Sequence, residues 1–172
     1  MEHRSAEVRS VAPAQRVVTV MVAPYNEISH LTDNPSGERF QRGAFTASLR
    51  GRERTIKLLR GHSTDRVYGM SKSFRETSEG LVSEFEIRHG APGDELLDDL
   101  SGGYMDVSAG FIVEKASHGP GGVRLVERAR LFEVSAVAIP AYAGSRVLAT
   151  RSAHTTPPRR TLEPWESPRR WQ

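Results

Sequence analysis

Cysteine is absent from the 172 residues of this chain. Its absence excludes disulfides, thiolate metal ligands and a cysteine nucleophile. Covalent catalysis would therefore have to use serine, threonine, lysine or a carboxylate. No glycine-rich phosphate loop opens a helix, and no histidine has a supporting set of metal ligands. We therefore expect no cofactor and no metal ion.

Long apolar runs are also missing. Apolar residues make up 37% of the chain, and no run approaches the roughly 18 residues that a membrane-spanning helix needs. The longest run near the start, Val17 to Ala23, has the length of a strand. The first fifteen residues lack the apolar core of a secretion signal. The sequence therefore predicts a soluble protein that is not exported and has no membrane partner.

The main part of the chain has no excess of positive charge, although the net charge is +3. Five arginines and two glutamates lie from Arg151 onward, and removing them from totals of 24 and 21 leaves 19 groups of each sign. A basic face that would bind nucleic acid is therefore not expected on residues 1–150. An accessory protein that binds DNA through an arginine-rich tail is a rival hypothesis, and it predicts salt-dependent binding.

Composition divides the chain into three parts. Residues 150–172 contain four prolines and few aliphatic side chains, which predicts a disordered Arg/Pro-rich tail. Residues 1–13 are predicted to be a flexible N-terminus, and residues 14–149 a folded domain. A tail of this composition is expected to be dispensable for folding.

Short apolar and β-branched segments between turn residues predict a mainly β protein. Helices are expected only at Phe40–Leu49 and Pro92–Leu100, and turns at 79–80 and 119–122. Many short strands with few helices favour a mostly antiparallel barrel or closed sheet. The expected strands are 16–23, 55–59, 66–74, 81–88, 104–114, 122–128 and 131–139.

Ser108 lies within a predicted strand whose alternate residues are apolar. Because alternate residues of a strand share a face, one face carries apolar side chains at 105, 107, 109, 111 and 113. Ser108 and Gly110 share the other face, and a glycine there leaves room for another backbone to approach. Rigid support with open access suits a nucleophile. A small surface serine is the alternative interpretation.

His62 follows the apolar pair Leu58-Leu59, then Arg60 and Gly61. This pattern predicts a histidine where a strand gives way to a loop. An imidazole titrates near neutral pH, so it can take a proton from a hydroxyl and return it to a leaving amine. A capping or surface histidine is the alternative.

Glu133 interrupts the apolar stretch Leu131 to Val137 and is expected on the same face as Leu131 and Ser135. A carboxylate in an apolar setting needs a partner, because an unpaired buried charge is costly. It could orient His62 through the second ring nitrogen. It could equally pair with Arg130 or another arginine.

Eight short motifs, in the same order over about 130 residues, resemble the prohead protease family of tailed phages, which is itself similar to the herpesvirus assemblins. Each motif is weak alone, and their order gives the resemblance its specificity. The motifs are Ala23-Pro24-Tyr25-Asn26-Glu27, Gly37-Glu38-Arg39-Phe40 with Gly43-Ala44-Phe45, Gly61-His62, Gly80-Leu81, the 94–100 helix, Ser108-Ala109-Gly110-Phe111, Leu131-Phe132-Glu133-Val134-Ser135 and Pro140-Ala141-Tyr142.

The resemblance implies an assemblin-like antiparallel β-barrel flanked by short helices, and a serine endopeptidase activity. Carried over by position, the family's serine falls on Ser108 and its histidine on His62. The acidic third member falls on Glu133, where assemblins have a second histidine. The residue after the family's histidine is often Asp or Asn, whereas here it is Ser63.

The same resemblance implies substrates and a location. The partner would be the scaffold, or a scaffold-like N-terminal segment of the major capsid protein, together with the protease itself through self-association. The site of action would be the interior of the assembling procapsid in the host cytoplasm. A catalytically inactive capsid scaffold or assembly protein is the alternative function.

Overall fold

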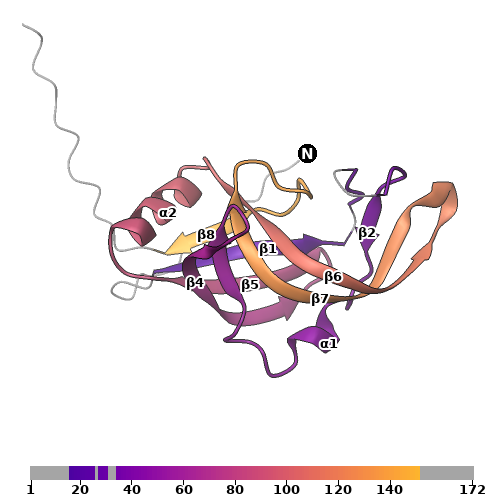
Figure 1. Cartoon of the computed structure of the whole chain (residues 1–172), viewed down its shortest axis with the longest axis horizontal. Coiled ribbons are helices and arrows are strands. Elements are labelled where there is room, and N and C mark those ends of the chain that lie inside the picture. The colour runs from indigo at the N-terminus through magenta and orange to yellow at the C-terminus, as the bar shows by residue number, and fades with distance from the viewer. Residues whose placement is uncertain (1–15, 26, 31–33, 152–172) are drawn as a thin grey trace, which may run out of the picture.

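The computed structural model describes residues 16–25, 27–30 and 34–151, and these form one mainly β structure around a single core (Figure 1). The two α-helices are short, and neither is long and apolar enough to cross a membrane. The elements are β1 Val17–Pro24, β2 Glu38–Phe40, α1 Thr46–Leu49, β3 Lys57–Arg60, β4 Ser63–Glu76, β5 Gly80–Ile87, α2 Ala91–Ser101, β6 Asp106–His118, β7 Arg124–Val137 and β8 Val147–Arg151.

All eight strands join one mixed sheet in the order β2-β7-β3-β4-β5-β1-β8, with β6 on the other edge of β7. The pairs are antiparallel except β2 with β7 and β3 with β7, which are parallel. The mainly β class with flanking helices is confirmed. The expected closure is not, because no strand pairing among the described residues completes a barrel.

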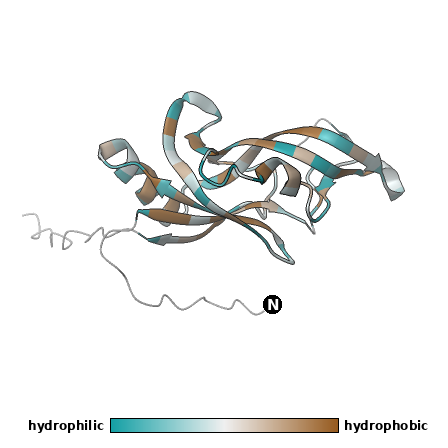
Figure 2. Cartoon of the chain, turned by 90° about the horizontal axis from the view of Figure 1, so that it is seen from below, coloured by the Kyte–Doolittle hydropathy of each residue, from teal (hydrophilic) through white to brown (hydrophobic). Residues whose placement is uncertain are grey.

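Local sequence explains most of the strands. Brown and teal segments alternate along the ribbons in Figure 2, as the two-residue period of half-buried strands requires. β1, which pairs with β5 and β8, departs from this pattern because nearly all of its side chains are buried. The predicted hairpin at 79–80 is present, with Thr77 Oγ1 donating to Gly80 O at 2.8 Å.

The predicted helix at Phe40–Leu49 is mostly wrong. Phe40, Ala44, Phe45 and Leu49 are all buried at a helix-like spacing, but Gly43 has a φ of +84° and interrupts any helix there. Phe40 instead ends β2, and only Thr46–Leu49 is helical.

Two further differences concern the second half of the chain. The segments expected at 122–128 and 131–139 are one continuous strand, β7. An unpredicted strand, β8, pairs with β1 as far as Arg151, so ordered backbone extends slightly past the expected domain end at 149. The predicted flexible N-terminus and the tail from 152 lie outside the described residues.

A buried carboxylate holds the β2 end of the sheet. Glu38 is 1% exposed, accepts a 2.7 Å hydrogen bond from the Tyr142 hydroxyl and lies 2.5 Å from Arg124 Nη2. Burial raises the pKa of Tyr142 and the hydrogen bond to Glu38 adds to this, so Tyr142 stays a neutral donor. The Tyr142 ring packs 4.8 Å from that of Phe40. The segment after β7 is thereby tied to β2.

Replacing Glu38 by alanine is expected to lower the free energy of unfolding by about 3–5 kcal/mol, because it removes a buried carboxylate that binds both Arg124 and the Tyr142 hydroxyl. Glu114→Ala is the matched control, since Glu114 makes only exposed ion pairs with Arg128 and Arg130 and should cost at most about 1 kcal/mol. Urea denaturation measures both. Equal losses in the two variants would contradict a structural role for the Glu38 contacts.

Candidate functional site

The candidate site is built on the antiparallel ladder of β6 and β7, which run side by side along much of the molecule (Figure 1). Ser108 lies directly opposite Ser135, and Gly110 lies opposite Glu133. Directly opposed residues place their side chains on the same face of the ladder. We call the face that carries Ser108, Gly110, Glu133 and Ser135 the site face.

A β-bulge in β7 puts Glu133 on this face. Phe111 pairs with Leu131 and Gly110 with Glu133, so Phe132 is an extra residue without an opposite partner. The bulge inverts the alternation of β7, as such insertions do. Leu131 is fully buried, whereas the Glu133 side chain faces away from the core and is 16% exposed. The expectation that Glu133 and Leu131 share a face is therefore wrong.

Gly110 provides the space that the Glu133 carboxylate occupies. A Cβ atom built on Gly110 would lie 2.0 Å from Glu133 Oε1, far inside van der Waals contact. The sequence pattern predicted that this glycine would admit another backbone. The structure shows that it admits a side chain from the opposing strand.

His62 occupies the two-residue turn between β3 and β4. Arg60 pairs with Ser63 across the turn, and both intervening residues have positive φ, +64° at Gly61 and +58° at His62. Positive φ at both positions is typical of the type I′ hairpin turn, and histidine tolerates this region better than most residues. The prediction of a histidine at the end of a strand is confirmed.

Parallel pairing of β3 with β7 brings this turn to the site face. Leu59 pairs with Ser135 and Arg60 with Ala136, and the next amide, Gly61 N–H, donates to Ala136 O at 2.9 Å. Arg60 also fixes the turn to α2, with Nη1 2.9 Å from Glu95 Oε1 and Nη2 2.8 Å from Asp99 Oδ2. The end of β3 is therefore held on two sides.

His62, Glu133 and Ser135 form one hydrogen-bonded unit. His62 Nδ1 lies 2.7 Å from Glu133 Oε1. Ser135 Oγ donates to Glu133 Oε2 at 2.6 Å and accepts from the backbone N–H of His62 at 3.0 Å. Both carboxylate oxygens are therefore bound. The arrangement leaves the other imidazole nitrogen, Nε2, facing away from Glu133.

Ser108 lies next to this unit but is more enclosed than expected. The residue is 6% exposed and lies opposite the fully buried Ser135. Within the described ranges, no hydrogen bond joins Ser108 Oγ to His62. Catalytic hydrogen bonds in ligand-free enzymes are often long and shorten when substrate binds.

The sequence left open an ion pair between Glu133 and Arg130 or another arginine. Arg130 does not pair with Glu133, because its Nε lies 3.7 Å from Glu114 Oε1 and its guanidinium lies over the Phe132 ring. Ser135, the serine opposite Ser108, is fully buried and donates its proton to Glu133, which leaves it badly placed to attack a substrate. Among the described residues, no group of three or more metal-ligating side chains occurs.

Comparison with known proteins defines the class. A sequence profile described as caudovirus prohead serine protease matches residues 4–158. The chain therefore belongs to the prohead serine protease family of tailed phages, and it is a serine endopeptidase of capsid maturation. A comparison with curated proteins found no match.

Two solved structures are similar to this chain. The bacteriophage T4 capsid assembly protease aligns with a TM-score of 0.54 at 11% identity, over 70% of this chain and 80% of that one. The varicella-zoster virus protease aligns with a TM-score of 0.42 at 15% identity, over 76% of this chain and 62% of that one. The first likeness supports the fold described above.

Gly110→Ala is expected to displace the Glu133 carboxylate from His62, because the added methyl would occupy the position of Glu133 Oε1. Protease activity should fall at least about a hundredfold, which is the scale that misplacing a catalytic group costs. Gly119→Ala is the matched control, since a Cβ there meets nothing closer than 3.8 Å. Wild-type cleavage rates in both variants would contradict the role given to this close approach.

Proposed function

We propose that Ser108 is the nucleophile, His62 its general base and Glu133 the group that orients His62. The observation that carries the proposal is the 2.7 Å contact between His62 Nδ1 and Glu133 Oε1, made beside the strand position of Ser108. A carboxylate that accepts a hydrogen bond from Nδ1–H leaves Nε2 unprotonated, and Nε2 is then free to act as the base.

The reaction follows from these roles. Ser108 Oγ attacks the scissile carbonyl carbon while His62 Nε2 takes the hydroxyl proton. His62 then gives that proton to the leaving amine as the peptide C–N bond breaks, and an ester to Ser108 remains. A water molecule, deprotonated by His62, hydrolyses the ester and releases the acid product. Glu133 stabilises the imidazolium that forms in each half of the reaction.

Ser135 supports the geometry without entering the chemistry. Its hydroxyl binds Glu133 and the backbone of His62 at the same time. One buried side chain therefore fixes the relative positions of Glu133 and His62. Such supporting contacts keep a site within the narrow tolerance that catalysis requires.

The substrate we propose is the scaffold, or a scaffold-like N-terminal segment of the major capsid protein, cleaved together with the protease itself inside the assembling procapsid. Support comes from the family and from the structural similarity to the T4 capsid assembly protease. Mass spectrometry of capsid protein coexpressed with this chain tests it. A new N-terminus on the capsid protein or on a scaffold supports the proposal, and intact partners would contradict it.

Ser108→Ala is expected to give a folded protein that processes no capsid precursor. The change removes one small hydroxyl that bonds to no other described side chain, so the free energy of unfolding should change by less than about 1 kcal/mol. Ser63→Ala is a matched control, since Ser63 lies beside the His62 turn and has no proposed role. Processing at the wild-type rate by Ser108→Ala would refute the assignment of the nucleophile.

Glu133→Gln separates an orienting role from a structural one. No described cation is left unpaired by this change, so we expect a small effect on melting temperature. Cleavage should fall strongly, by about ten-thousand-fold if Glu133 matters as much as the corresponding acid of a well-studied serine protease. Melting temperature and cleavage rate are measured on one preparation. A stable and fully active variant would eliminate the orienting role.

A further inference from the structure

A cleft lies at the start of β6, two residues before Ser108. It has a volume of about 410 Å³, which is within the usual range of ligand sites. Asp106, two residues before Ser108 on β6, belongs to its wall. Because residues i and i+2 of a strand share a face and lie about 7 Å apart, the cleft begins at the distance of two peptide residues from the Ser108 hydroxyl. Six of its lining residues determine its charge and its apolar surface: Glu27, Ile28, Asp106, Ile139, Pro140 and Ala141.

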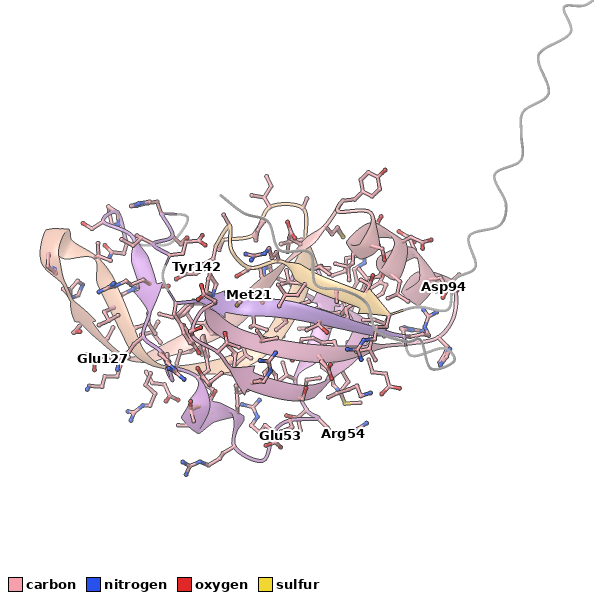
Figure 3. The ribbon with its side chains drawn as sticks, turned by 180° about the vertical axis from the view of Figure 1, so that it is seen from behind. Met21, Glu53, Arg54, Asp94, Glu127 and Tyr142 are labelled. Carbon is pink, nitrogen blue, oxygen red and sulfur yellow. The ribbon has the colours of Figure 1, made fainter. Side chains whose placement is uncertain are left out.

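Hydrogen bonds hold together the two segments that form this cleft, residues 27–30 and residues 139–144. Ser29 donates a hydrogen bond to the Ala141 carbonyl, and Glu27 Oε2 accepts one from Gly144 N–H at 2.7 Å. The segment between β7 and β8 lies along the upper edge of the view in Figure 1, above β6 and β7. Its Tyr142, labelled in Figure 3, turns inward to the buried Glu38. The wall is therefore anchored in the core.

The cleft is lined by two carboxylates and by no lysine or arginine among the described residues. Asp106 is half-buried and has no ion-pair or hydrogen-bond partner among the described residues. The carboxylate of Glu27 adds a second negative group. None of the described lining residues is lysine or arginine, and the one basic side chain is that of His30, which is exposed. A half-buried carboxylate favours a cationic partner.

The remaining wall is apolar and includes two exposed side chains. Ile139 is 79% exposed and Ile28 is 43% exposed. Apolar walls with carboxylates beside them match a lysine or arginine side chain, whose aliphatic stem packs on apolar surface while its charged end binds acidic groups. A glutamate or aspartate side chain would meet like charge, and a plain aliphatic one would leave Asp106 unpaired.

We infer that this cleft is a specificity pocket that takes a basic side chain of the substrate, within about two residues of the scissile bond. The inference rests on the proposed function, since it uses Ser108 as the point of attack. The chain carries such residues itself: Arg159-Arg160 and Arg169-Arg170 follow β8 in the sequence. Its own tail thus carries side chains of the kind that the cleft fits.

Peptide profiling of the full-length protein tests this inference. A degenerate peptide mixture, analysed by mass spectrometry, identifies the sequences that are cleaved. In the best of them, each arginine is then replaced by citrulline, which has the same shape without the charge. We expect kcat/KM to favour arginine over citrulline by about tenfold or more at one position, the scale of a charged hydrogen bond. Cleavage without such a preference would overturn the inference and leave the proposed function standing.

Substitutions then assign the preference to the cleft. Asp106→Asn should reduce the ratio to about twofold or less, because the neutral amide gives no ion pair. Asp98→Asn, on the exposed face of α2, is the matched control and should keep the wild-type ratio. A tenfold preference that survives in Asp106→Asn would overturn the assignment.

If Asp106→Asn does not fold, a second variant tests the same assignment. Ile139→Lys changes a side chain that is 79% exposed and places a cation at the rim, so the preference for arginine should fall several-fold with the fold intact. An unchanged ratio of kcat/KM between arginine and citrulline peptides would overturn the assignment of the preference to the cleft. A wild-type protein that cleaves no peptide at all would instead overturn the proposed function, and this inference with it.

Discussion

The register of β6 against β7 is the constraint on which the site depends. One extra residue in β7, Phe132, turns Glu133 out of the core, and the glycine opposite it leaves the space that its carboxylate fills. The same register sets Ser108 beside Ser135. Shifting the pairing by one residue would exchange the two faces of the ladder and bury the carboxylate without a partner.

The parallel pairing of β3 with β7 supplies the third component. It carries the Gly61–His62 turn across the sheet to Glu133, while Arg60 binds α2 from the other side. Catalytic groups on paired strands and a tight turn are held more firmly than groups on long loops.

Local pattern was sufficient for part of this account. Strand alternation predicted the core face of β6 correctly, and the strand-then-glycine pattern placed His62 in a turn. The bulge at Phe132 was not predictable, because an inserted residue is visible only against the partner strand. β2 and β8 were missed for a related reason: Glu38–Phe40 is too short, and Val147–Arg151 too exposed, to show a period. The meeting of Glu133 with His62 depends on a pairing between segments about seventy residues apart, which no local spacing encodes.

The most direct test of the account is to identify the residue that a serine-directed fluorophosphonate modifies. Only a serine whose hydroxyl is activated by a neighbouring base should react. Peptide mapping of the labelled protein by tandem mass spectrometry gives the position. The account predicts one modified residue, Ser108, and loss of labelling when His62 is replaced by alanine. Labelling at Ser135, or labelling of Ser108 that does not depend on His62, would contradict it.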